Sequence, residues 1–149
     1  MLLVSKKHSA EIAGFHVAPL VNPKKGGARH QWFVEFTKEP ENLGEFEKSL
    51  DESVQNQNTY YKDLISGSIL SNLEIIKIQK NGFNDYMKSI GKLGGQNKIP
   101  RLSNDRSIAE ELRSFINWLS ATLSLGQQGP PYGVAPLKKR LPILWDKAF

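Results

Sequence analysis

The chain has 149 residues and a net charge of +5, a length that fits one domain with a buried core and leaves no room for a second domain of ordinary size. It contains no cysteine, which excludes disulfides and thiolate metal sites and is compatible with a cytoplasmic protein. Most of the excess positive charge lies at the C-terminal end, because residues 120–149 hold four basic residues and one acidic residue, a net charge of +3 out of +5. Elsewhere the charges alternate in sign without clustered cations and interleaved aromatic residues, which argues against nucleic-acid binding.

The N-terminal quarter of the chain favours a β-hairpin. Residues 2–13 show no clean helical stripe and are interpreted as the remnant of a helix. The apolar run at residues 1–4 is too short for a signal peptide, and no later run approaches the length of a membrane span. Residues 14–21 are typical of a strand with Pro19 at a sheet edge, and residues 22–27 of a turn. Residues 29–36 form the clearest strand, with alternating side chains that predict one buried face. That face holds Trp32, Val34 and Phe36.

Two helices and a third strand are predicted next. Asn42 is a suitable N-cap for a helix over residues 43–57, since its side chain can accept from amides of the first turn and Glu45 stands three residues later. A shorter helix is predicted to begin after residue 58. Residues 73–80 then resemble a strand with apolar and polar side chains on both faces, so both faces are expected to be partly covered.

The remaining elements complete an α+β fold. Apolar residues at helical spacing predict a short helix over 83–90, and the polar residues at 103–105 favour the start of another helix that extends to about residue 118. Residues 119–149 are interpreted as an irregular basic tail. We therefore predict a small antiparallel or mixed sheet of three to four strands flanked by helices.

The loop at residues 91–101 is the strongest candidate for a functional site. It holds three glycines within five positions, which allow its backbone to approach a ligand closely. Lys98 and Arg101 supply charges that suit a phosphate, and Pro100 between them stiffens the end of the loop. Composition alone favours a simpler interpretation, a solvated connector between two helices.

No other motif gives the chain a self-sufficient active site. The three histidines, His8, His16 and His30, do not share a metal-ligand spacing with one another or with a carboxylate, so no metal site is expected. His16 and His30 fall in the predicted hairpin, where a polar edge position accounts for them. Phosphate-binding, dinucleotide-binding and serine-hydrolase motifs are absent from the sequence.

Three blocks of sequence nevertheless resemble a known family. Residues 30–36 (HQWFVEF), 50–64 (LDESVQNQNTYYKDL) and 82–104 (GFNDYMKSIGKLGGQNKIPRLSN) are similar to the C-terminal domain of the auxin-responsive promoter family of acyl-acid amido synthetases, and most similar to its bacterial members. The similarity extends over about residues 14–117. The positions that match the family's loop pattern are Gly95, Gln96, Lys98, Pro100 and Arg101.

The resemblance implies that residues 1–118 are a mobile lid domain. Family enzymes bind ATP with Mg²⁺ and a carboxylic acid on a large N-terminal domain, form an acyl-adenylate, and pass the acyl group to an amine, commonly an amino acid. By this resemblance Lys98 would support adenylation, and Gly95, Gln96 and Arg101 would bind substrate or phosphate or anchor the loop. Without the N-terminal domain as partner the chain is expected to be inactive. The alternative is a non-catalytic protein-interaction module.

Overall fold

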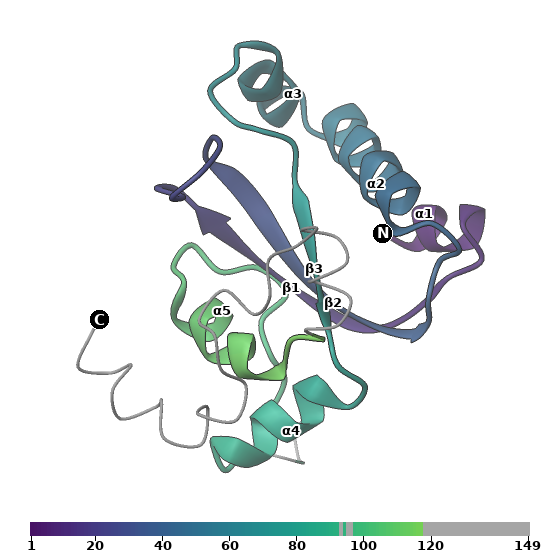
Figure 1. Cartoon of the computed structure of the whole chain (residues 1–149), viewed down its shortest axis with the longest axis vertical. Helices are drawn as coiled ribbons and strands as arrows, with labels where there is room; N and C mark the ends of the chain where they lie inside the picture. Colours follow the sequence, from purple (N-terminus) through teal and green to yellow (C-terminus); the bar gives the residue numbers. More distant parts are fainter. Residues whose placement is uncertain (93, 95–96, 118–149) are drawn as a thin grey trace.

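A computed structural model describes residues 1–92, 94 and 97–117 and shows a three-stranded mixed sheet with helices (Figure 1). The elements are α1 (Leu2–Lys7), β1 (Glu11–Leu20), β2 (Arg29–Lys38), α2 (Leu43–Gln57), α3 (Thr59–Ser66), β3 (Glu74–Ile78), α4 (Gly82–Ser89), α5 (Ser107–Leu112) and a 3₁₀ turn (Arg113–Phe115). The strand order is β1-β2-β3, antiparallel between β1 and β2 and parallel between β2 and β3. The predicted α+β fold is therefore confirmed. The predicted tail lies outside the described residues, and no described helix is long and apolar enough to cross a membrane.

The predicted hairpin is confirmed, but β1 begins earlier than its sequence pattern suggested. The strand starts at Glu11, inside the segment interpreted as a helix remnant, and only residues 2–7 are helical. Register shifts at Glu11/Ile12 and Ile12/Gly14 interrupt the alternation of side chains in this part of the strand, so the pattern could not reveal it. Pro19 lies opposite His30 on an edge strand, where the missing N–H is tolerated.

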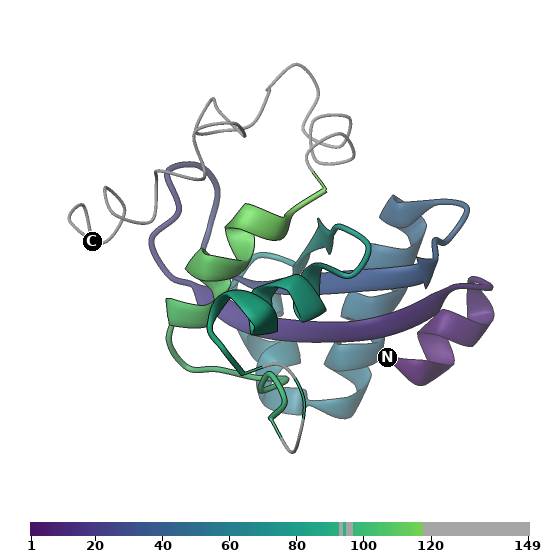
Figure 2. The same cartoon turned by 90° about the horizontal axis from the view of Figure 1, so that it is seen from below.

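Helices cover both faces of the sheet (Figures 1 and 2). On one face, α1 and α2 pack over a core of Val4, Ala10, Val34, Phe36, Phe46, Leu50, Leu73 and Ile75. On the other face, α4 and α5 pack over a second core of Ala18, Phe33, Ile78, Tyr86, Met87, Ala109, Leu112 and Ile116. β2 therefore contributes buried side chains alternately to two layers, whereas its pattern had predicted only one buried face.

The helix α2 begins and ends as predicted, but one residue of its polar face is buried. The Asn42 side chain accepts from the Glu45 N–H at 3.1 Å. Asp51 is only 3% exposed and accepts hydrogen bonds from four groups. These donors are the Tyr61 hydroxyl, the Gln55 and Asn72 side-chain amides and the Leu73 N–H. Asp51 thus joins α2, α3 and the chain that enters β3.

The helix predicted over residues 103–118 is wrong in its bounds, because both ends of that segment bind the sheet instead. The Ser103 N–H donates to the Val17 carbonyl, and residue 102 forms a parallel bridge with the outer edge of β1. At the other end the Asn117 N–H donates to the Lys77 carbonyl, beside an antiparallel bridge between Ile78 and Ile116. Only Ser107–Leu112 remains as α-helix. Arg106 occupies the N-cap position without a side-chain capping bond, while the Asp105 carboxylate accepts from the Ser107 N–H at 2.9 Å.

Candidate functional site

The entry to the loop is fixed by a buried carboxylate on β2. Glu35 is 6% exposed, and its two oxygens accept from the Asn81 N–H at 2.8 Å and the Phe83 N–H at 3.2 Å. These are donors at the start of α4, where a negative charge is favourable. Gly82 is required between them, since a Cβ there would lie 2.3 Å from the Ile78 Cγ2. The position of α4, and hence of the chain entering the loop, depends on this contact.

The end of the loop is fixed to β1 by an exit segment, residues 99–103. Ile99 packs against the second core. The next carbonyl, that of Pro100, accepts a hydrogen bond of 2.6 Å from Nδ1 of His16. The Arg101 carbonyl then accepts from the Val17 N–H at 2.8 Å, before the bridge at residue 102. Lys98 is therefore the last residue before a stretch of backbone that is held against the sheet.

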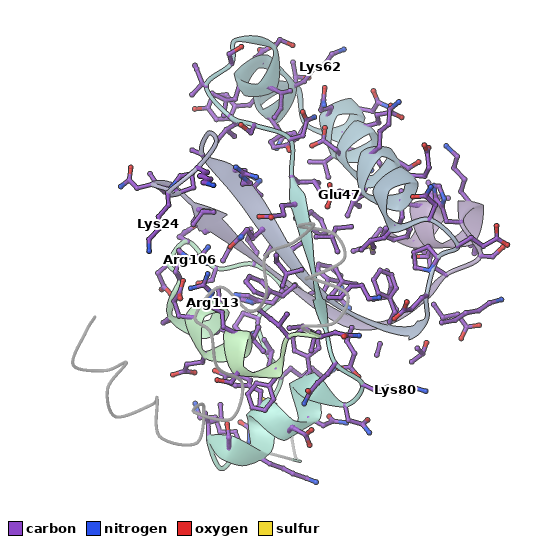
Figure 3. All side chains as sticks on the ribbon, in the orientation of Figure 1. Lys24, Glu47, Lys62, Lys80, Arg106 and Arg113 are labelled. Carbon is purple, nitrogen blue, oxygen red and sulfur yellow. The ribbon has the colours of Figure 1, made fainter. Side chains whose placement is uncertain are left out.

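The chain beyond the exit segment is held by Arg106, which is labelled in Figure 3. Its guanidinium donates to the Pro19 carbonyl and to the Gln31 side-chain oxygen, both at 2.8 Å, and to Glu110 at 2.9 Å. Gln31 in turn donates to Glu74 on β3 at 2.8 Å. This chain of polar contacts crosses all three strands, so the start of α5 has a fixed position over the sheet.

The structure brings the two predicted cations to the same exit but gives them different surroundings. Lys98 is exposed and, among the described residues, has no hydrogen-bond or ion-pair partner. The Arg101 guanidinium lies 5.5 Å from the centre of the Phe15 ring, and that ring stacks on Trp32. Arg101 thus contacts β1 through both its carbonyl and its side chain. The other two predicted site residues, Gly95 and Gln96, lie outside the described residues.

The prediction that His16 occupies a polar edge position is wrong. Its side chain is fully buried and faces the second core, 6.4 Å from the Phe33 ring. Burial lowers the pKa of His16, although the bond to Pro100 acts in the opposite direction. Because a carbonyl can only accept, Nδ1 carries the proton in this contact. The other ring nitrogen, Nε2, is buried and has no partner among the described residues.

The burial of His16 predicts a pH dependence of stability. Its pKa is lowered in the folded chain, so the unfolded chain binds more protons once the pH falls below the ordinary value of about 6.5. Between pH 7 and 5 the free energy of unfolding of the wild type should therefore fall more steeply than that of His16→Asn, by at most about 1.4 kcal/mol per pH unit. Urea titrations at several pH values measure both slopes. Parallel slopes would show that His16 does not titrate in this window.

Sequence patterns missed the residues that shape this site. Glu35 and Gln31 are on the face of the clearest strand that was not predicted to be buried, and Arg106 was not singled out. Each acts through a partner far away in sequence, such as Asn81 for Glu35 or Pro19 for Arg106. No local pattern could have revealed them. Among the described residues, no three His, Cys, Asp or Glu side chains gather in a way that could hold a metal ion.

This architecture defines a small α+β domain, in which helices cover both faces of a three-stranded sheet. The family model "GH3 family C-terminal domain" matches residues 2–107, which is most of the chain. The chain belongs to the GH3 family and corresponds to its C-terminal domain, which confirms the family resemblance of the three sequence blocks. No curated protein sequence matches the chain.

Solved structures of acyl acid amido synthetases share the fold. One, described as "GH3.15 acyl acid amido synthetase", matches with a TM-score of 0.59 and 15% identity over 76% of this chain and 20% of its own. A second, "AtGH3.15 acyl acid amido synthetase in complex with 2,4-DB", matches with a TM-score of 0.60 and 14% identity over 76% of this chain and 21% of its own. The chain thus spans about a fifth of the length of these enzymes.

Proposed function

We propose that the chain is the mobile lid of an ATP-dependent acyl acid amido synthetase and closes over an acyl-adenylate site on an N-terminal domain. The observation that carries this proposal is the exposed ammonium of Lys98, placed directly before backbone that is bound to β1. Because the backbone after Lys98 is held in place, its ammonium would reach the same position on the N-terminal domain each time the lid closes. The family of the chain and the fold it shares with amido synthetases support this assignment.

In the closed state, Lys98 would act on the adenylation step. A lysine ammonium can offset the negative charge that develops between a substrate carboxylate and the α-phosphate, and its effect grows when closure excludes water. Arg101 would hold the loop end through its contacts with Val17 and Phe15. Gly95 would let the loop backbone approach the phosphates, and Gln96 would bind substrate or phosphate or anchor the loop.

The remaining components of the reaction would belong to the N-terminal domain. The described residues offer no cluster of metal ligands, so ATP with Mg²⁺ would be bound mainly by the partner domain. The carboxylic acid and the amine or amino acid that accepts the acyl group would also bind there. We call the enzyme that combines this chain with such a domain the parent enzyme.

Deletion of residues 1–117 from the parent enzyme tests the proposal. The truncated enzyme should still bind ATP, because most ATP contacts would lie on the N-terminal domain, but it should lose carboxylate-dependent exchange of pyrophosphate into ATP. Isothermal titration with ATP and a radiolabelled pyrophosphate assay measure the two properties. Retention of full exchange would overturn the proposal and favour a non-catalytic interaction module.

A further inference from the structure

We propose that His16 is a positioning residue for Lys98, because its side chain sets the path by which the loop leaves the surface of β1. This role rests on the proposed function of Lys98. His16 lies on β1, far from the loop in sequence, and it was not among the residues expected to contribute to the site. The contact it makes is with Pro100, two residues after Lys98.

The geometry favours control of Lys98 by this one side chain. Among the described residues, consecutive residues of β1 supply the three hydrogen bonds that join the exit segment to the sheet: the His16 ring binds Pro100, and the main chain of Val17 binds Arg101 and Ser103. Of these bonds, the one from His16 is nearest in sequence to Lys98. Because the ring of Pro100 fixes its φ angle, holding its carbonyl limits the directions that the preceding backbone can take.

The unpartnered ring nitrogen argues that His16 is more than a core residue. Its Nε2 is buried and has no hydrogen-bond partner within the part of the chain that the structure describes, and a buried polar atom without such a partner opposes folding. A leucine of similar size on this face, among Phe33 and Ala18, would avoid that cost. A histidine at this position is explained if its Nδ1 hydrogen bond holds the Pro100 carbonyl in place, because a hydrocarbon side chain cannot form that bond.

Two substitutions separate the hydrogen bond from the packing. Asparagine carries its amide nitrogen on Cγ, as histidine carries Nδ1, so His16→Asn keeps a donor near the Pro100 carbonyl. His16→Leu keeps an apolar side chain and removes the donor. His30→Leu is the matched control, because His30 lies on the same hairpin and stacks on Tyr61 rather than touching the exit segment.

Nuclear magnetic resonance of the 149-residue chain tests the positioning itself. The ring of His16 should show the tautomer protonated at Nδ1. In His16→Leu, amide exchange at Ser103 should accelerate roughly fivefold or more relative to amides of α2, as expected for one lost hydrogen bond. His16→Asn and His30→Leu should leave that ratio near the wild-type value. A ring protonated at Nε2, or unchanged exchange at Ser103 in His16→Leu, would overturn the proposal.

Kinetics of the parent enzyme then test whether positioning matters for the reaction. His16→Leu should lower kcat for pyrophosphate exchange by about tenfold to a hundredfold at an unchanged KM for ATP, and His16→Asn should restore most of it. If Lys98→Ala abolishes exchange while His16→Leu does not change it, the role of His16 is overturned and the proposed function stands. If Lys98→Ala does not change the rate of exchange, the proposed function of the loop and the role of His16 in it are both overturned.

Discussion

Replacement of Lys98 by alanine is expected to lower carboxylate-dependent pyrophosphate exchange by the parent enzyme about 100- to 1,000-fold, the usual effect of removing one group that stabilises developing charge. The affinity for ATP should change little, because under the proposed function Lys98 would act only when the domain closes. Lys98 is exposed and is not part of either core, so the substitution should leave the fold intact. Exchange kinetics and equilibrium ATP binding measure the two effects separately.

Lys92→Ala provides the matched control for this experiment. Lys92 is also an exposed lysine of the loop, but it lies just after α4, with its N–H donating to the Met87 carbonyl. Its removal lowers the net charge by the same amount and should leave exchange within about twofold of the wild type, as for a screened surface charge. Equal losses in the two variants would mean that the loop acts through its overall charge, and equal retention of activity would remove Lys98 from the mechanism.

Truncation of Phe33 should destabilise the domain by about 3–5 kcal/mol, the range for removing a large aromatic side chain from a core. Phe33 is 1% exposed on β2 and packs beneath α4 and α5 in the second core. In Phe33→Ala, α4 and the exit segment lose part of the layer that supports them. Denaturant unfolding monitored by circular dichroism gives the free energy, and amide exchange shows which elements loosen first.

Phe46→Ala makes a comparable cavity in the other layer. Phe46 is fully buried on α2 and contacts Phe36 across the first core. We expect a similar loss of stability but early loosening of α1 and α2 instead of the exit segment. If both variants loosened the same elements first, the two layers would be a single cooperative unit, and the sheet would not separate them energetically.

The elements of the fold that could be predicted from the sequence are those whose signals lie within a few neighbouring residues, such as an N-cap or a regular spacing of apolar side chains. The helix α2 has an N-cap and apolar residues at four-residue spacing, and both of its bounds were predicted correctly. The mixed character of the third strand correctly indicated cover on both faces. Errors occurred where distant contacts override local preference. Residues 103–105 looked like a helix start, but Ser103 pairs with Val17 instead.

The candidate site was accessible from the sequence only in part. Lys98 and Arg101 were identified from loop composition and family resemblance, and their roles stay predictions. The residues that hold the two ends of the loop, Glu35 and His16, were assigned to solvent or edge positions. The hairpin sequence does not reveal that α4 and α5 cover the second face of the sheet. Burial of a carboxylate becomes favourable only when the first amides of α4 are brought to it, and that is a property of the assembled fold.

The outer edges of β1 and β3 are both partly covered by other segments of the chain. After Gly82 the chain crosses to the free side of β1, pairs there at residue 102, and returns to the free side of β3 at Ile116. The Ile75 N–H on that side is occupied by Glu47, which extends from α2 toward β3 in Figure 3. Unpaired strand edges are templates for aggregation. A version trimmed at residue 107, where the family match ends, would therefore expose the β3 edge and become prone to self-association.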